Sequence, residues 1–153
     1  MKKRSESTLN NPKKSINFEF LTITNDIDEE IIKKVLEYMS RSYWANRRAE
    51  EITRKAIKNS LCFSLFYKGM QIGFARVITD YTTHAYLCDV FIDENFRGFG
   101  VGQWFINEML NYPDLKGMKR WFLLTKDAQT FYQKNGFKFL EDSKKYLELV
   151  REQ

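Results

Sequence analysis

The chain has 153 residues, of which 43% are hydrophobic and 16% aromatic. This composition fits one folded domain and excludes a wholly disordered protein. No apolar run approaches the ~20 residues that a membrane-spanning helix needs, and the N-terminal residues lack the apolar segment of a signal peptide. We therefore expect a soluble, cytoplasmic protein without a membrane partner.

The net charge of +5 is concentrated at the N-terminus. Residues 1–14 hold five basic and one acidic side chain, a net of +4, so residues 15–153 carry only +1. A tail rich in Lys, Ser and Asn predicts a disordered, solubilising segment over residues 1–15, followed by a single domain over residues 16–153. A basic arm for nucleic acid is the alternative. The tail lacks the interleaved aromatic residues of such arms, so we do not expect nucleic-acid binding.

The spacing of apolar residues predicts helices and strands in alternation. In chain order we expect a strand over 18–24, helices over 27–39 and 46–58, a hairpin of strands over 61–68 and 70–79, a strand over 83–92, a helix over 101–111, a strand over 119–125, a short helix around Tyr132, and closing strands over 137–140 and 145–150. Asp26 or Asp28 could cap the first helix. This order by itself supports a mixed α/β domain.

A glycine-rich turn joins the strand that ends at Ile92 to the helix after it, and it is the most informative motif of the chain. It reads Arg97, Gly98, Phe99, Gly100, Val101, Gly102. Glycines lack the Cβ atoms that keep a ligand away from the backbone, so consecutive N–H groups can point at one anion. The helix dipole and the arginine add positive charge. The turn therefore predicts a pyrophosphate site, with a glycine-rich connection that binds nothing as the alternative.

Two common nucleotide motifs do not fit this turn. A P-loop ends in Gly-Lys-Ser/Thr, but Gln103 and Trp104 follow Gly102. A dinucleotide fingerprint that starts at Gly98 needs a third glycine at position 103. What remains is Arg-x-x-Gly-x-Gly after a strand, which resembles the acyl-CoA signature of the GNAT N-acetyltransferase superfamily.

A second segment strengthens this resemblance. Residues 128–137 read Ala-x-x-Phe-Tyr-x-Lys-x-Gly-Phe, which is similar to the second half of the GNAT acetyl-CoA site. The resemblance covers roughly Ser40 to Phe139. Within the superfamily, the chain is similar to a group of small bacterial proteins whose acceptors are unassigned. It implies a GNAT fold: a central mixed, mostly antiparallel sheet of six to seven strands, with about four flanking helices and with strands four and five splayed apart.

The resemblance also implies acetyl-CoA as co-substrate, without a metal. Its expected binding residues come from the central strand, the glycine turn and the second segment: Val90, Phe91, Ile92, Arg97, Gly98, Phe99, Gly100, Val101, Gly102, Thr125 and Phe131. Tyr132 would donate a proton to the leaving thiolate, unless it is a packed aromatic whose hydroxyl binds a backbone carbonyl. Many members carry asparagine at the position of Thr125, which could equally be a β-branched residue that ends a strand.

The general base is open between two residues of the central strand and ordered water. Asp89 is expected to share a face with Leu87 and Phe91. Its carboxylate could orient the acceptor ammonium, pass its proton to water, or accept structural hydrogen bonds. His84, the only histidine, has the intrinsic pKa of a base but could be a solvated surface residue. Tyr132 and Asp89 are our catalytic candidates.

The acceptor wall is expected at the junction of the first two helices, where Tyr43 and Trp44 could stack on an acceptor or pack the junction. Glu50 and Glu51 could attract an amine or simply be solvated. The expected function is acetyl transfer to a small-molecule or peptide amine by direct attack in a ternary complex. The alternative is a non-catalytic acyl-CoA-binding or regulatory domain. A homodimer is compatible with the sequence, which does not give the oligomeric state.

Overall fold

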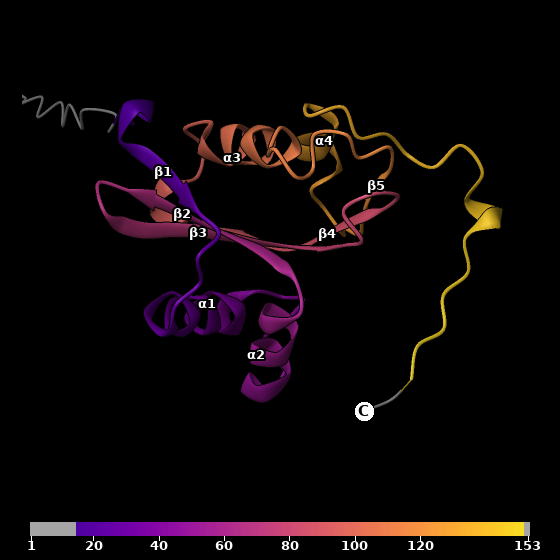
Figure 1. Cartoon of the computed structure of the whole chain (residues 1–153), viewed down its shortest axis with the longest axis horizontal. Helices are drawn as coiled ribbons and strands as arrows, with labels where there is room; N and C mark the ends of the chain where they lie inside the picture. The colour runs from indigo at the N-terminus through magenta and orange to yellow at the C-terminus, as the bar shows by residue number, and fades with distance from the viewer. Residues whose placement is uncertain (1–14, 152–153) are drawn as a thin grey trace, which may run out of the picture.

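The computed structural model describes residues 15–151. It contains one five-stranded sheet with helices on both faces (Figure 1). The strands are β1 (Leu21–Thr24), β2 (Leu61–Tyr67), β3 (Met70–Thr79), β4 (Ala85–Ile92) and β5 (Trp121–Leu123). The helices are α1 (Glu29–Arg41), α2 (Glu50–Lys58), α3 (Val101–Leu110) and α4 (Gln129–Gln133), and short 3-10 turns lie at Phe18–Phe20, Glu94–Phe96 and Ser143–Lys145.

The strands lie in the sheet in their order along the chain, β1-β2-β3-β4-β5. The first four pair antiparallel, and β5 runs parallel to β4. Figure 1 shows α1 and α2 on one face and α3 and α4 on the other. The predicted mixed α/β fold, with a mostly antiparallel sheet and about four helices, is confirmed, although the sheet has five strands instead of six to seven.

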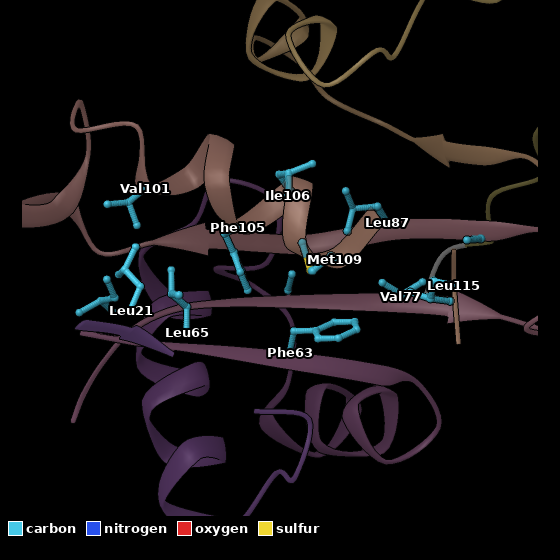
Figure 2. Close-up of a cluster of buried hydrophobic side chains, with 13 residues drawn as sticks. Leu21, Phe63, Leu65, Val77, Leu87, Val101, Phe105, Ile106, Met109 and Leu115 are labelled. Carbon is cyan, nitrogen blue, oxygen red and sulfur yellow. The ribbon is translucent and has the colours of Figure 1, made fainter. Parts of the chain in front are cut away.

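Two hydrophobic clusters fill the space between the sheet and its helices. Under α3, the residues Phe105, Ile106 and Met109 are almost fully buried against Phe63 and Leu65 of β2 (Figure 2). On the opposite face, Val35, Tyr38 and Met39 of α1 pack with Phe74 and Phe91. The sheet is therefore covered on both sides by apolar side chains, which is the main source of its stability.

A bulge interrupts β4 at Asp89. The register pairs Phe74 with Phe91 and Arg76 with Cys88, so two residues of β4 oppose one residue of β3. Asp89 takes the left-handed conformation, with φ of 51°, which is uncommon for a residue other than glycine. The expectation that Asp89 shares a face with Leu87 and Phe91 is wrong.

The bulge reverses the face of the sheet on which alternate side chains of β4 lie. Leu87, before the bulge, belongs to the cluster under α3, whereas Phe91, after it, belongs to the cluster under α1. The parallel pairing with β5 covers only residues 85–87, so the two strands part just before the bulge. The predicted splaying of strands four and five is confirmed.

The last predicted strands, over 137–140 and 145–150, are wrong. Residues 137–151 form no strand, and their only regular element is the 3-10 turn Ser143–Lys145. Leu147 is 97% exposed, and Leu149 and Val150 are each 77% exposed. A strand needs a neighbouring edge to satisfy its backbone groups, so an alternating pattern alone does not form one.

The start of α2 also differs from the prediction. We expected a helix from residue 46, but residues 43–48 form tight turns and α2 begins at Glu50. The N–H of Asn46 donates to the Ser42 carbonyl and that of Arg48 to the Ala45 carbonyl. These turns place Trp44 and Arg48 against β4, where both side chains donate hydrogen bonds to Asp89.

Three expectations concern features that the structure describes only in part. Residues 1–14, the predicted tail, lie outside the described residues. Between residues 15 and 151, no helix is both long and apolar enough to cross a membrane. The same residues contain no cluster of three or more His, Cys, Asp or Glu side chains suited to a metal ion. Cys62 and Cys88 are free thiols, and burial raises the pKa of Cys88 to about 11.

The two candidate caps of α1 give a testable difference in stability. The Asp28 side chain accepts the N–H of Ile31 at 2.9 Å, which caps the helix, whereas the backbone N–H of Asp26 donates to Thr24 Oγ1. Asp28→Ala should lower the free energy of unfolding by about 1 kcal/mol. The control, Asp26→Ala, should change it by no more than a few tenths. Urea unfolding of the two variants measures both values, and equal losses would contradict the cap assignment.

Candidate functional site

A cleft of about 780 Å³ opens beside the end of β4. Its walls come from β4, the turn that follows it, the first turn of α3, α4 and the connection after α1. Most predicted binding residues line it: Val90, Phe91, Ile92, Arg97, Gly98, Gly100, Gly102 and Phe131, together with the candidate acid Tyr132. Three predicted residues are not in this lining: Phe99, Val101 and Thr125.

The turn between β4 and α3 presents a run of free backbone donors. No backbone or side-chain acceptor among residues 15–151 receives the N–H groups of residues 98–103. Gly98 and Gly100 both have φ of 82°, and a Cβ on Gly98 would have no heavy atom within 4 Å. Val101 is buried in the core, so only its backbone N–H can serve the cleft. This geometry fits an anion, because consecutive N–H groups converge at a helix N-terminus.

Gly102 has a different reason to be glycine. A Cβ at this position would lie 3.2 Å from the ring of Phe131 and 3.5 Å from Cγ1 of Ile92. α4 therefore approaches the first turn of α3 so closely that no larger residue fits without movement. The contact holds α4, and with it Tyr132, at the side of the cleft.

Two arginines and one glutamate stand at the anion end of the cleft. Arg97 donates from Nε to the Ile92 carbonyl at 2.8 Å, and its guanidinium lies 4.9 Å from the centre of the Phe91 ring. Arg41 binds Glu94 through Nε and Nη2, both at 3.1 Å, and these bonds hold the pKa of Glu94 below its ordinary value. Arg41 Nη1 also binds Glu37 at 3.0 Å, so Arg41 is paired with two carboxylates and Arg97 is the less neutralised guanidinium at this end of the cleft.

Several residues of this cleft were not predicted from the sequence. Arg41, Glu94, Gln103, Asp127 and Lys134 also line it. The Nε2 atom of Gln103 is buried without a hydrogen-bond partner among the described residues. Lys134 stands in the Phe-Tyr-x-Lys pattern, which was the available signal for it.

Tyr132 lies between the first cleft and a second cavity. Its ring packs edge-on against Phe131 and Phe137, at centroid distances of 4.9 and 5.8 Å. No partner for its hydroxyl exists among residues 15–151, so the alternative of a hydroxyl bound to a backbone carbonyl is not what the structure shows. Burial raises the pKa of Tyr132 to about 12. The phenol is therefore protonated and free to donate at neutral pH.

Thr125 stabilises the turn before α4 through hydrogen bonds. Its Oγ1 accepts the N–H of Ala128 at 3.0 Å, and its carbonyl accepts from the Gln129 side chain at 3.3 Å. It lines the second cavity instead of the first. The geometry favours a structural role for Thr125 over contact with the donor.

The second cavity, of about 320 Å³, lies on the other side of Tyr132 and Val90. Asp89 is at its wall, with a side chain only 3% exposed. Arg48 donates to both carboxylate oxygens, at 2.9 and 3.0 Å, and Arg76 Nε donates to Oδ2 at 2.8 Å. Trp44 Nε1 donates to Oδ1 at 3.2 Å. Every oxygen of Asp89 is thus occupied.

This network bears on the roles considered for Asp89. Burial raises its pKa, but the bonds and charges of Arg48 and Arg76 outweigh burial and hold the pKa below its ordinary value. A carboxylate with two charged partners is a poor proton acceptor, so the geometry favours structural hydrogen bonding. Neither arginine was predicted from the sequence, because they lie 41 and 13 residues away from Asp89 and outside β4.

Of the other residues predicted as base or acceptor wall, some line the two cavities and others lie on the surface. His84 is exposed, stacks on Phe122 at 5.8 Å and lines neither cavity, which favours the surface alternative. Tyr43 and Trp44 line both cavities. Glu50 pairs with Arg54 at 2.8 Å on the exposed face of α2. Neither Glu50 nor Glu51 lines a cavity.

The chain resembles known proteins over this region. Residues 58–139, more than half of the chain, match the Acetyltransferase (GNAT) domain. A Gibberella zeae protein named as an acetyltransferase is 31% identical over 115 residues, which cover 61% of this chain and 63% of that protein. The chain therefore spans less than two thirds of this relative.

Solved structures agree with the domain match. A Xanthomonas campestris pv. campestris protein assigned to the GNAT family is 33% identical, with a TM-score of 0.78 over 86% of this chain and 93% of that one. A Clostridium acetobutylicum acetyltransferase solved with acetyl-CoA is 16% identical, with a TM-score of 0.65 over 85% and 96%, and it shows a shared fold. On the domain match and the Xanthomonas structure, the chain belongs to the GNAT acetyltransferase family.

Proposed function

We propose that this protein is an N-acetyltransferase that moves an acetyl group from acetyl-CoA to an amine, by direct attack in a ternary complex. The observation that carries the proposal is the run of free N–H groups at residues 98–103, which opens on the same cleft as the free hydroxyl of Tyr132. One end of the cleft suits a pyrophosphate and the other a leaving thiolate. The acetyl-CoA in the Clostridium acetobutylicum structure is consistent with this assignment.

The residues of the cleft fit the two ends of acetyl-CoA. The N–H groups after Gly98 and the charge of Arg97 would hold the pyrophosphate, because donors and a helix N-terminus converge there. Lys134 and the buried Nε2 of Gln103 add donors that lack partners among the described residues. The thioester of the bound donor supplies an activated acetyl group.

The gap between β4 and β5 would hold the acetyl end. β5 pairs with β4 only as far as Leu87, so backbone N–H groups of residues 90–92 that face the gap have no strand beside them. Such donors can bind a carbonyl oxygen and stabilise the negative charge that it gains during attack. Tyr132 is the general acid in this proposal, since its raised pKa keeps the proton on the phenol until the sulfur takes it.

We assign Asp89 to positioning and not to proton transfer. Its oxygens hold Arg48, Arg76 and Trp44, three side chains that shape the second cavity. Water that enters this cavity would take a proton from the acceptor ammonium, and the neutral amine that results would attack the thioester. The acceptor amine would approach Tyr132 from the second cavity, because Tyr132 and Val90 line both spaces.

Gly100→Asp tests the anion site. A carboxylate among the free N–H groups would satisfy them and repel phosphate, so the affinity for acetyl-CoA should fall by about 100-fold or more. Isothermal titration calorimetry measures the change. Gly69→Asp is the matched control, since Gly69 has nearly the same φ, 80°, in the turn between β2 and β3 and lines no part of the cleft. Similar affinity in the two variants would refute the anion site.

Tyr132→Phe tests the acid. Removal of the hydroxyl should lower kcat by about 100-fold or more, because the thiolate must then leave without a proton donor. Release of free thiol from acetyl-CoA, followed with a panel of amines, measures kcat. Tyr81→Phe is the control, because Tyr81 is exposed and lines neither cavity. Full turnover of the Tyr132 variant would show that another group is the acid.

The same assays separate catalysis from binding alone. Calorimetry that detects acetyl-CoA, together with thiol release on at least one amine, supports the acetyltransferase. Tight binding without thiol release on any amine would support a non-catalytic acyl-CoA-binding domain instead.

A further inference from the structure

The second cavity carries more positive charge than its buried carboxylate balances. Arg48 and Arg76 together contribute two charges and Asp89 one of opposite sign, so the cluster keeps a net charge of +1. The Arg48 side chain is 22% exposed and that of Arg76 is 10% exposed, and both line the cavity. A partly buried positive charge attracts an anion, because nearby protein screens it less than water would.

Both arginines keep hydrogen-bond donors beyond those that Asp89 uses. A guanidinium has five N–H donors. Arg48 binds Asp89 through Nη1 and Nη2, and Arg76 uses Nε for Asp89 and Nη1 for Ser60. In the part of the chain that the structure describes, Arg48 Nε and Arg76 Nη2 have no hydrogen-bond partner. A ligand carboxylate could accept from either group without breaking the network.

The rest of the cavity suits a small acceptor with two charged ends. Asp127 is the one further charged residue in its lining; it is exposed and borders both cavities, as Tyr132 does. An ammonium can therefore be held toward Tyr132 and a carboxylate toward the arginines. Trp44 and Tyr86 provide apolar surface between these ends. The volume, about 320 Å³, is at the small end of ligand sites.

We propose that the acceptor is a small amine that also carries a carboxylate, as an amino acid does. The carboxylate binds at Arg48 and Arg76, and the amine lies toward Tyr132. This inference rests on the proposed acetyltransferase function, and it names the class of its acceptor.

Matched acceptors test the inference on the unaltered protein. Each amino acid of a panel is compared with its amide and with its decarboxylated amine, by thiol release from acetyl-CoA. We expect at least one amino acid to exceed both of its counterparts in kcat/KM by about tenfold or more, the effect of one charged hydrogen-bonded pair. Equal or lower values for every amino acid overturn the inference and leave the proposed function standing. Absence of thiol release on all amines overturns the proposed function itself.

Arg48→Gln, with Arg47→Gln as control, locates the carboxylate site. Arg47 is exposed and lines neither cavity. In the Arg48 variant the preference for the amino acid over its decarboxylated amine should fall by about tenfold, mainly through KM. The ratio within one variant is insensitive to a loss of folded protein, because both acceptors meet the same enzyme. An unchanged ratio in the Arg48 variant overturns the assignment of Arg48.

A separate observation concerns the C-terminal segment. Beyond Phe137 the chain exposes large apolar side chains on an extended backbone: Phe139, Leu140, Tyr146, Leu147, Leu149 and Val150. Figure 1 shows the segment after α4 leaving the body of the molecule, with its end apart from β5. Between residues 15 and 151, β5 has a strand on one side only, and a cavity of about 220 Å³ lies against it, lined by Trp121, Leu123 and Phe137 among others.

We infer that the segment around residues 145–150 pairs with β5 of a second copy of this chain. The segment has strand-like alternation and unpaired backbone groups, and β5 has an unpaired edge, so each supplies what the other lacks. Because both features belong to one chain, two copies satisfy them reciprocally in a closed pair. Burial of Leu147 and Leu149 in the contact would remove the exposed apolar surface.

The mass in solution tests this exchange. Multi-angle light scattering of the full chain should give the mass of two chains, and the double variant Leu147→Asp with Leu149→Asp should give the mass of one. Met70→Asp is the control, since Met70 is 54% exposed and lies at the β2–β3 turn. A monomeric parent protein, or a double variant that stays dimeric, overturns the exchange.

Discussion

The parting of β4 and β5 is the constraint on which both cavities depend. Parallel pairing ends at Leu87, and the bulge at Asp89 then turns the strand. Had the pairing continued, β5 would have taken up the backbone groups of residues 90–92 and closed the space beside them. The gap lets Val90 border both cavities, with Tyr132 of α4 facing it from the far wall. Both cavities thus follow from one irregularity in the sheet.

The bulge persists because its surroundings hold it. A left-handed conformation at a residue other than glycine costs about 1–3 kcal/mol. At Asp89 four hydrogen bonds to the side chain, from Trp44, Arg48 and Arg76, offset this cost. These donors come from the connection after α1 and from β3, so the network holds one wall of the second cavity. The contact of Gly102 with Phe131 holds α4 at the side of the first cleft.

Local signals predicted most elements, and their failures have physical causes. The bounds of β3 and the start of α3 follow from apolar alternation and from the glycine turn, both of which act within a few residues. The run of free backbone donors at residues 98–103 was predictable for the same reason, since these donors are consecutive in the chain. The bulge was not predictable, because the regular alternation of a strand places Asp89 on the same face as Leu87. Arg48 and Arg76 reach Asp89 only after the sheet has formed. The closing strands were predicted from local alternation, but residues 137–151 do not pair with the free edge of β5 in this chain.

The carboxylate that Arg48 and Arg76 share has a consequence for how the second cavity can diverge between relatives. Arg48 and Arg76 shape the second cavity, yet each also neutralises Asp89, whose side chain is almost fully buried. Loss of one arginine leaves a buried charge less well paired, which is costly in folded proteins. A relative that changes the second cavity at these positions must therefore alter Asp89 as well, or weaken the sheet. The three residues should vary together, as a single inherited unit.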